Sequence, residues 1–141
     1  MAPNNSRTLT YYASFLCANK RYLQSQKLYE KAINEVDNTQ LGVTYLAYAF
    51  CQQTEGNNEE AKKLYKSAIE QNPTLSSAYL SLAKIYVDEK KYEIADNMLN
   101  NYLNLEVQNR TSLEIEIQIA QGLNEENREA TAKLILNSLY Q

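Results

Sequence analysis

The sequence has no histidine and no tryptophan, and its 141 residues include only three glycines, two prolines and two cysteines. Without histidine, the chain cannot form a histidine-based acid–base pair or a histidine-rich metal site. A glycine-rich phosphate-binding loop is also missing. Because helix breakers are scarce and alternating β-branched residues are few, the composition favours an all-α chain of one domain's length.

Long apolar runs and a strong charge of one sign are absent too. No run approaches the roughly 18 apolar residues that a membrane-spanning helix needs, and no basic segment followed by an apolar one opens the sequence as in a signal peptide. The net charge is only −3, and no basic stripe accompanies the 12 tyrosines. We therefore predict neither a direct membrane span nor a nucleic-acid partner.

The two cysteines and the carboxylates suggest no catalytic site. Cys17 and Cys51 lack CxxC spacing, and no histidine can activate either thiol. The favoured interpretation is two small buried apolar residues. A disulfide is the open alternative, because the two residues belong to neighbouring helices of the chain's repeats and could approach each other, but sequence does not show the geometry that a disulfide needs. Four clustered carboxylates lie at predicted turns, where helix starts explain them: Glu59, Glu60, Glu125 and Glu126. The sequence thus predicts a non-enzymatic protein without metal or cofactor.

The chain is organised around an internal repeat. Lys63–Ile69 (KLYKSAI) resembles Lys27–Ile33 (KLYEKAI), 36 residues earlier, and Tyr79–Ala83 matches Tyr45–Ala49 at a distance of 34 residues. Self-similarity near 34 residues is typical of a stacked array of helix pairs. We expect four helix-turn-helix repeats at about residues 6–41, 42–75, 76–109 and 110–141, forming a single domain.

Apolar stripes at helical spacing give the expected helices. In the first repeat they predict helices near Thr8–Asn19 and Leu23–Val36, with Leu9, Tyr12, Ala13 and Leu16 on one buried stripe. Capping boxes are predicted for two later helices, Asn57 with Glu60 and Thr111 with Glu114. The last helix is expected over Ala130–Leu139. A strand over residues 114–119 is the minority alternative, because glutamate and isoleucine alternate there.

These patterns match the tetratricopeptide repeat. Glu55–Ala61 is the strongest segment, a small residue recurs at the eighth position (Ala13, Ala49, Ala83), and Pro73 stands where that repeat usually has proline. The resemblance implies an all-α tetratricopeptide-repeat superhelix of about four repeats. Departures occur at Ser25, Gln52, Val107, and Glu129 or Ala130, so the register of the fourth repeat stays open. Repeats of the Sel1 type are the nearest alternative, and they would also give stacked helix pairs.

A narrower resemblance covers nearly the whole chain. The segments Tyr12–Cys17, Tyr48–Cys51 and Ala78–Lys84, followed by the tail Ser112–Glu125, are similar to successive helices of the PilF/PilW family. That resemblance implies a pilotin lipoprotein of the periplasmic face of the outer membrane, which assists the type IV pilus secretin. Members have about six repeats, of which this chain would match the last four. Their lipidated cysteine lies upstream and has no counterpart here.

The first residues predict that the sequence starts within a repeat. Pro3-Asn4-Asn5-Ser6 precedes its helix as Pro73-Thr74-Leu75-Ser76 precedes the helix that contains Ala78. A proline at this place usually follows the end of a helix, because it lacks an N–H group and cannot continue the helix. We therefore expect that Pro3 belongs to the tail of a repeat whose body is absent from this sequence.

Binding is the function that remains. In stacked helix pairs the first helices line a concave surface, and the repeat register predicts a partner-binding groove there: Tyr11, Ser14, Leu46, Phe50, Gln53, Leu80, Lys84 and Val87. Leu46, Phe50 and Leu80 are the expected central anchor for an apolar or amphipathic peptide. The set of lysine and asparagine residues with which some chaperone-binding members of the repeat superfamily hold a C-terminal carboxylate is missing, and only Lys84 fits it. The open alternatives are that some of these side chains only pack between repeats, and that the protein is a generic cytoplasmic scaffold or co-chaperone.

Overall fold

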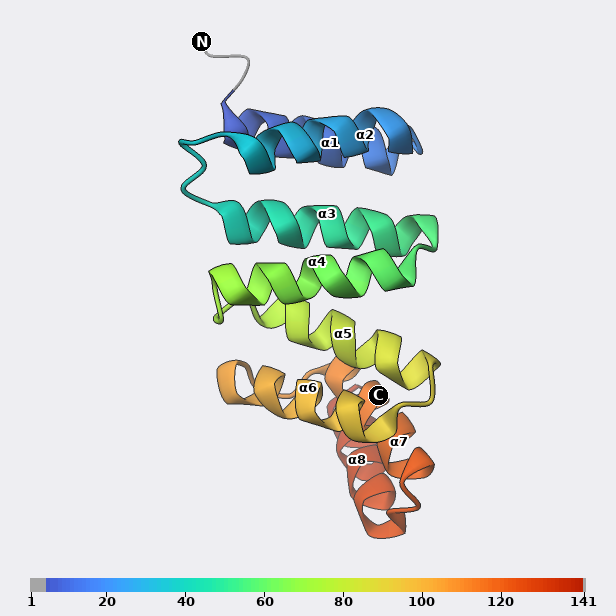
Figure 1. Ribbon diagram of the computed structural model, residues 1–141. Helices are drawn as coiled ribbons and strands as arrows, with labels where there is room; N and C mark the ends of the chain where they lie inside the picture. The colour runs from blue at the N-terminus through green and yellow to red at the C-terminus, as the bar shows by residue number, and fades with distance from the viewer. Residues whose placement is uncertain (1–4, 141) are drawn as a thin grey trace. The chain divides into compact units, whose positions relative to one another are not determined.

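A computed structural model describes residues 5–140, and it confirms the all-α prediction (Figure 1). Within those residues the secondary structure consists of helices, and residues 114–119 are helical rather than extended. The helices are α1 (Ser6–Ala18), α2 (Tyr22–Asn34), α3 (Leu41–Glu55), α4 (Asn58–Gln71), α5 (Ser76–Asp88), α6 (Tyr92–Leu105), α7 (Arg110–Gly122) and α8 (Glu126–Leu139). In the described part of the chain, no helix has the length and apolar character needed to cross a membrane. The prediction that rests on Pro3 lies outside the described residues.

The chain divides into two compact units, residues 1–75 and 76–141. The first contains α1–α4 and the second contains α5–α8, so the division falls at the predicted boundary between the second and third repeats. The single-domain interpretation stays a prediction, and the two units are described separately.

In the first unit, α1 pairs with α2 and α3 pairs with α4, while α3 also packs against both helices of the first pair (Figure 1, blue to green). Small residues allow the paired helices to approach each other closely, since Ala13, Ala49 and Ser25 are completely buried. The Ser25 hydroxyl donates a hydrogen bond to the carbonyl of Ala13 at 2.7 Å. One residue of the predicted stripe departs from the prediction. Tyr12 is 55% exposed, although Leu9, Ala13 and Leu16 are buried as expected.

In the second unit, α5 pairs with α6 and α7 pairs with α8, and α7 also contacts α5 and α6. Ala83, Ala95 and Leu99 are completely buried, in agreement with the predicted stripes. The last helix begins at Glu126, four residues before the predicted start, and Ala132 is its one buried residue in the described chain. The backbone near Gly122 lies so close to the ring of Tyr92 that a side chain at position 122 would displace the ring.

Four turns of the same geometry set the register of the repeats. Lys20, Gly56, Lys90 and Asn124 each have a positive φ, between 59° and 96°. In every case the next residue donates its N–H to the carbonyl five residues earlier, as Arg21 does to Leu16 and Glu125 does to Ala120, which ends the first helix of the pair. The turns are 36, 34 and 34 residues apart. The fourth repeat therefore continues the 34-residue period, and Glu129 takes the place of Ser25, Ala61 and Ala95.

Both predicted capping boxes are wrong. Asn57 does stand at the N-cap of α4, but its side chain makes no cap bond and instead donates to Gln52 at 2.8 Å. The N-cap of α7 is Asn109 rather than Thr111, and it forms a reciprocal box with Ser112. A short amide side chain at a helix start can form a hydrogen bond either with the free N–H groups of the first turn or with a neighbouring side chain. Which of these bonds forms depends on the polar groups within reach.

Candidate interaction surface

In the first unit, exposed apolar side chains occur on the first helices at the positions predicted for the groove. Tyr11 on α1 and Phe50 on α3 are each 63% exposed, and Leu46 is half-buried. Val43, a further exposed apolar residue of α3, is 42% exposed. Their helices are fixed from behind by the buried faces of the same helix pairs. The unit therefore holds aromatic and aliphatic side chains on rigid elements, with their apolar atoms open to solvent.

Two other predicted groove residues are tied to the second helix of their own pair. The hydroxyl groups of Ser14 and Tyr29 lie 2.8 Å apart, and the hydroxyl of Tyr65 donates to Gln53 at 2.6 Å. These bonds link α1 to α2 and α3 to α4. Ser14 and Gln53 thus orient the surface and have less hydrogen-bonding capacity left for a partner.

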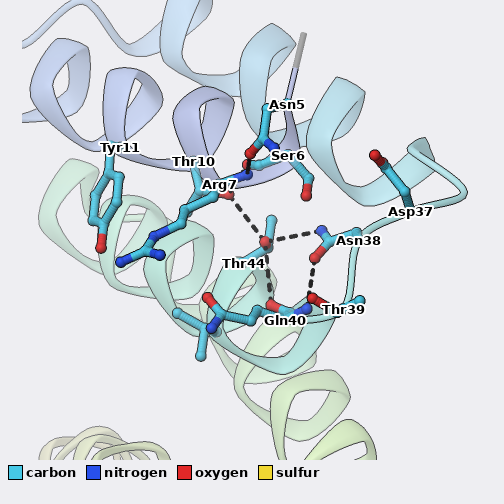
Figure 2. A pocket seen from close by; sticks show the side chains of 11 residues that line it. Asn5, Ser6, Arg7, Thr10, Tyr11, Asp37, Asn38, Thr39, Gln40 and Thr44 are labelled. Atoms are coloured by element: carbon cyan, nitrogen blue, oxygen red, sulfur yellow. Dashed lines mark hydrogen bonds between the residues drawn. The ribbon is translucent and has the colours of Figure 1, made fainter. Parts of the chain in front are cut away.

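A polar pocket of about 200 Å³ adjoins Tyr11 (Figure 2). It lies between the start of α1, the connection from α2 to α3, and the start of α3. Its wall is built by Thr44, whose Oγ1 is 3.0 Å from that of Thr10 and accepts from the side chain of Asn38 at 3.1 Å. The Asn38 side chain also donates to the carbonyl of Ala32 and accepts from the N–H of Gln40, so it fixes the whole connection.

Charged groups stand at the rim of this pocket. The Arg7 guanidinium lies over the ring of Tyr11, 5.7 Å from its centroid, a cation–π contact that holds both side chains in place. Tyr11 and Asp37 lie at opposite ends of the pocket in Figure 2. A partner that inserts next to Tyr11 therefore meets a cation and a phenol ring together, with hydroxyl and amide groups behind them.

In the second unit, the three predicted groove residues differ in exposure. Lys84 is exposed and Leu80 is half-buried, which is compatible with a contact surface. Val87 is only 7% exposed and lies beside Gln121 and Gly122 of α7. Because it is buried, Val87 is left out of the surface that we propose below.

Cys17 and Cys51 form a disulfide bond, with their Cα atoms 6.0 Å apart. The prediction of two unpaired apolar residues is therefore wrong. The residues are separated by 34 positions, whereas the first repeat is 36 residues long, so the two cysteines are not equivalent in the repeat. Adjacent first helices contact each other through opposite faces, so the residues that meet between them have different positions in the repeat, as Thr10 and Thr44 also do. The signal in the sequence was the placement of the two cysteines on neighbouring first helices, where they could approach each other.

Two buried tyrosines of the first unit, Tyr29 and Tyr48, have raised pKa values. Burial raises the pKa of Tyr48 to about 12, and the negative charge of Glu30 adds to the increase. Burial also raises the pKa of Tyr29, although its hydrogen bonds with Ser14 and Ser25 oppose the change. Over residues 5–140, no group of three or more metal-ligating side chains converges.

Comparison with known proteins agrees with this architecture. Residues 53–114 match the family model of the tetratricopeptide repeat. The fold is a tetratricopeptide-repeat fold. No curated protein matches the sequence significantly.

Solved structures with the same fold include those of PilF and PilW. PilF of Pseudomonas aeruginosa superposes with a TM-score of 0.88 at 22% sequence identity, over 99% of this chain and 63% of that chain. PilW, described as a widely conserved type IV pilus biogenesis factor, superposes with a TM-score of 0.87 at 19% identity, over 99% of this chain and 64% of that one. This chain thus spans slightly less than two thirds of the length of either protein. The predicted likeness to PilF and PilW is confirmed at the level of the fold.

Proposed function

We propose that this protein is a non-enzymatic interaction module in which the first helices bind an apolar or amphipathic segment of a partner protein. The observation that carries the proposal is the exposure of Tyr11 and Phe50 at groove positions of the repeat. Binding energy at protein interfaces is concentrated in a few apolar or aromatic anchors. Phe50 is the principal anchor of the first unit, with Leu46 beside it in the register and Tyr11 contributed by α1.

We propose that the second unit carries contact residues of its own on α5, the half-buried Leu80 and the exposed Lys84, which take the repeat positions that Leu46 and Phe50 have in the first unit. The Lys84 ammonium group suits an acidic side chain or a carboxylate of the partner. Repeats of this kind use several first helices at once, so each contributes a small part of the total affinity.

We further propose that the partner belongs to the type IV pilus machinery and that the protein assists the outer-membrane secretin from the periplasm. Fold likeness to PilF and to the pilus biogenesis factor PilW supports this assignment. The Cys17–Cys51 disulfide supports it independently, since disulfides persist in oxidising compartments such as the periplasm and are rare in the cytosol. For the same reason the disulfide disfavours the alternative of a cytoplasmic scaffold or co-chaperone.

The test is a titration of secretin-derived peptides against the oxidised protein and two variants. Phe50→Ala should weaken binding by about 2 kcal/mol, near thirtyfold. Lys63→Ala, at an exposed position on α4, is the matched control and should bind like the parent. Circular dichroism should be used to check that each variant is folded. Equal affinity of Phe50→Ala and the parent would place the site elsewhere, and binding of no secretin segment by the parent would refute the pilus assignment.

A further inference from the structure

The polar pocket beside Tyr11 contains a hydroxyl group that the fold does not use. Ser6 is only 8% exposed and lines this pocket, and Figure 2 shows its side chain turned toward the pocket. Its Oγ forms no hydrogen bond with the described residues, whereas the carbonyl of the same residue accepts from the hydroxyl of Thr10. Buried hydroxyl groups normally have a partner. The Ser6 hydroxyl is therefore available to a group that enters the pocket.

The start of α3 supplies further hydrogen-bond donors to the same pocket. No side chain caps this helix, and its first bonded N–H is that of Thr44, which donates to the carbonyl of Gln40. The N–H groups of residues 41–43 thus have no acceptor among the described residues, and they give the helix start a partial positive charge. At the start of α1, by contrast, the Asn5 side chain accepts from two N–H groups. The uncapped start of α3 therefore favours an anion in the pocket.

The charged side chains of the pocket lie at its two ends. Arg7 has a cation–π contact with Tyr11, but it pairs with no carboxylate of the described chain. Asp37 is the one acidic residue among the described residues that line the pocket, and it is exposed at the end opposite Tyr11. An exposed charge is screened by solvent and salt. Asp37 therefore weakens the preference for an anion, and the guanidinium, the hydroxyl and the free N–H groups together outweigh it.

We propose that this pocket binds a carboxylate group of the partner segment. One carboxylate oxygen accepts from the Ser6 hydroxyl and the other from the free N–H groups at the start of α3, while the guanidinium of Arg7 attracts the charge at the rim. The site is distinct from the lysine and asparagine set of chaperone-binding repeats, because Lys84, the residue that fits that set, belongs to the second unit.

The pocket lies at a fixed distance from the apolar anchor of the groove. Val43 lines the pocket, and Phe50 follows seven residues later on the same side of α3, so the two are about 10 Å apart along the helix axis. An extended chain covers this distance with about three residues, and a helix covers it with two turns. The inference rests on the proposed function: the carboxylate of the bound segment lies about three positions from its apolar anchor if the segment is extended, and about seven positions if it is helical.

Small carboxylate fragments test the pocket without the groove. The N–H signals of the isotope-labelled, oxidised protein are followed by NMR during a titration with acetylglutamate methylamide, and acetylglutamine methylamide is the neutral control of the same shape. Only the glutamate fragment should shift the signals of residues 41–43, and its affinity should fall at high salt. Acetylalanine carries the carboxylate of a chain terminus. Whichever carboxylate binds more tightly identifies the source, an acidic side chain or a C-terminus of the partner.

Three variants identify the groups that hold the carboxylate. Ser6→Ala should weaken binding of the glutamate fragment about fivefold, because a charge-assisted hydrogen bond is lost. Its urea midpoint of unfolding should equal that of the parent, because the hydroxyl has no structural partner. Arg7→Gln should also weaken binding, and Arg21→Gln, at an exposed arginine beyond the other end of α1, is the matched control that should bind like the parent. Asp37→Asn should strengthen binding, because it removes a nearby negative charge.

Equal shifts with the glutamate and glutamine fragments would overturn the proposal, and so would unchanged binding by Ser6→Ala. The fragments carry no apolar anchor, so their titration does not depend on Phe50. Failure of the fragments, together with a lower peptide affinity of Phe50→Ala, would refute the carboxylate pocket alone. Binding of the fragments, together with equal peptide affinities of Phe50→Ala and the parent, would refute the groove and leave the pocket in place.

Discussion

The ring of Tyr48 stacks on the ring of Tyr29, with centroids 5.0 Å apart and an angle of 12° between the planes. The contact joins α2 to α3, so it lies between the first and second repeats. Tyr29 is also bonded to Ser14 of α1, and Tyr48 lies 3.4 Å from a carboxylate oxygen of Glu30. One aromatic pair thus couples three helices and places a phenol next to a negative charge.

This environment predicts a loss of stability at high pH. The folded-state pKa of Tyr48, about 12, is above the ordinary value of 10.0, so the folded protein keeps the phenolic proton where the unfolded chain releases it. The stabilisation is fully present below pH 10 and is lost as the pH rises from 10 to 12. The free energy of unfolding, measured with urea at pH 9, 10, 11 and 12, should fall between pH 9 and pH 12 in both proteins. The fall should be roughly 2–3 kcal/mol smaller for Tyr48→Phe than for the parent. Identical pH profiles of parent and variant would contradict the assignment.

Reducing the disulfide should destabilise the first unit. The bond closes a loop between residues 34 positions apart, and the chain-entropy relation gives roughly 3–4 kcal/mol for a loop of this length. The double variant Cys17→Ala and Cys51→Ala should show a similar loss in urea unfolding, and dithiothreitol should affect the parent but not the variant. A midpoint for the parent that is insensitive to dithiothreitol would show that the bond does not form in solution.

Enlarging the buried alanines of the first helices should strain the helix pairs. Ala49 and Ala83 are completely buried where paired helices approach closely, so Ala49→Leu or Ala83→Leu should cost roughly 1–3 kcal/mol through forced backbone shifts. Ala18→Leu and Ala130→Leu, at exposed positions, are the matched controls for the two units. Thermal melting monitored by circular dichroism distinguishes the pairs, and equal midpoints for buried and exposed variants would mean that the register is misplaced.

Arg128 should hold the last helix pair of the second unit through a charged network. Its guanidinium donates two hydrogen bonds to Asp96, at 2.6 and 3.1 Å, and one each to Glu116 and Glu125. These bonds raise the pKa of Arg128 and join α6, α7 and the start of α8. Arg128→Lys keeps the charge but loses the planar fork, and we expect it to cost about 2 kcal/mol. Denaturant unfolding measures the loss, and a variant as stable as the parent would show the network to be neutral.

The sequence by itself determined the helices and their pairing. The 34–36-residue period, the small residues Ala13, Ala49 and Ala83, and the spaced tyrosines predict stacked helix pairs, because a helix must bury an apolar stripe against its neighbour. The same periodicity located Phe50 and Tyr11 on the first helices, where the structure finds them exposed. These features depend on local spacing along one or two helices, which a sequence displays directly.

Tertiary structure decided what depends on neighbouring helices. The Cys17–Cys51 bond depends on which faces of α1 and α3 contact each other. The caps of α4 and α7 depend on which polar group lies within reach. Tyr12 and Val87 have the periodicity of core and surface positions respectively, yet Tyr12 is exposed and Val87 is buried. Burial is a property of the packed partner as well as of the residue, so periodicity gives the face of a helix, and only the arrangement of helices determines whether that face is covered.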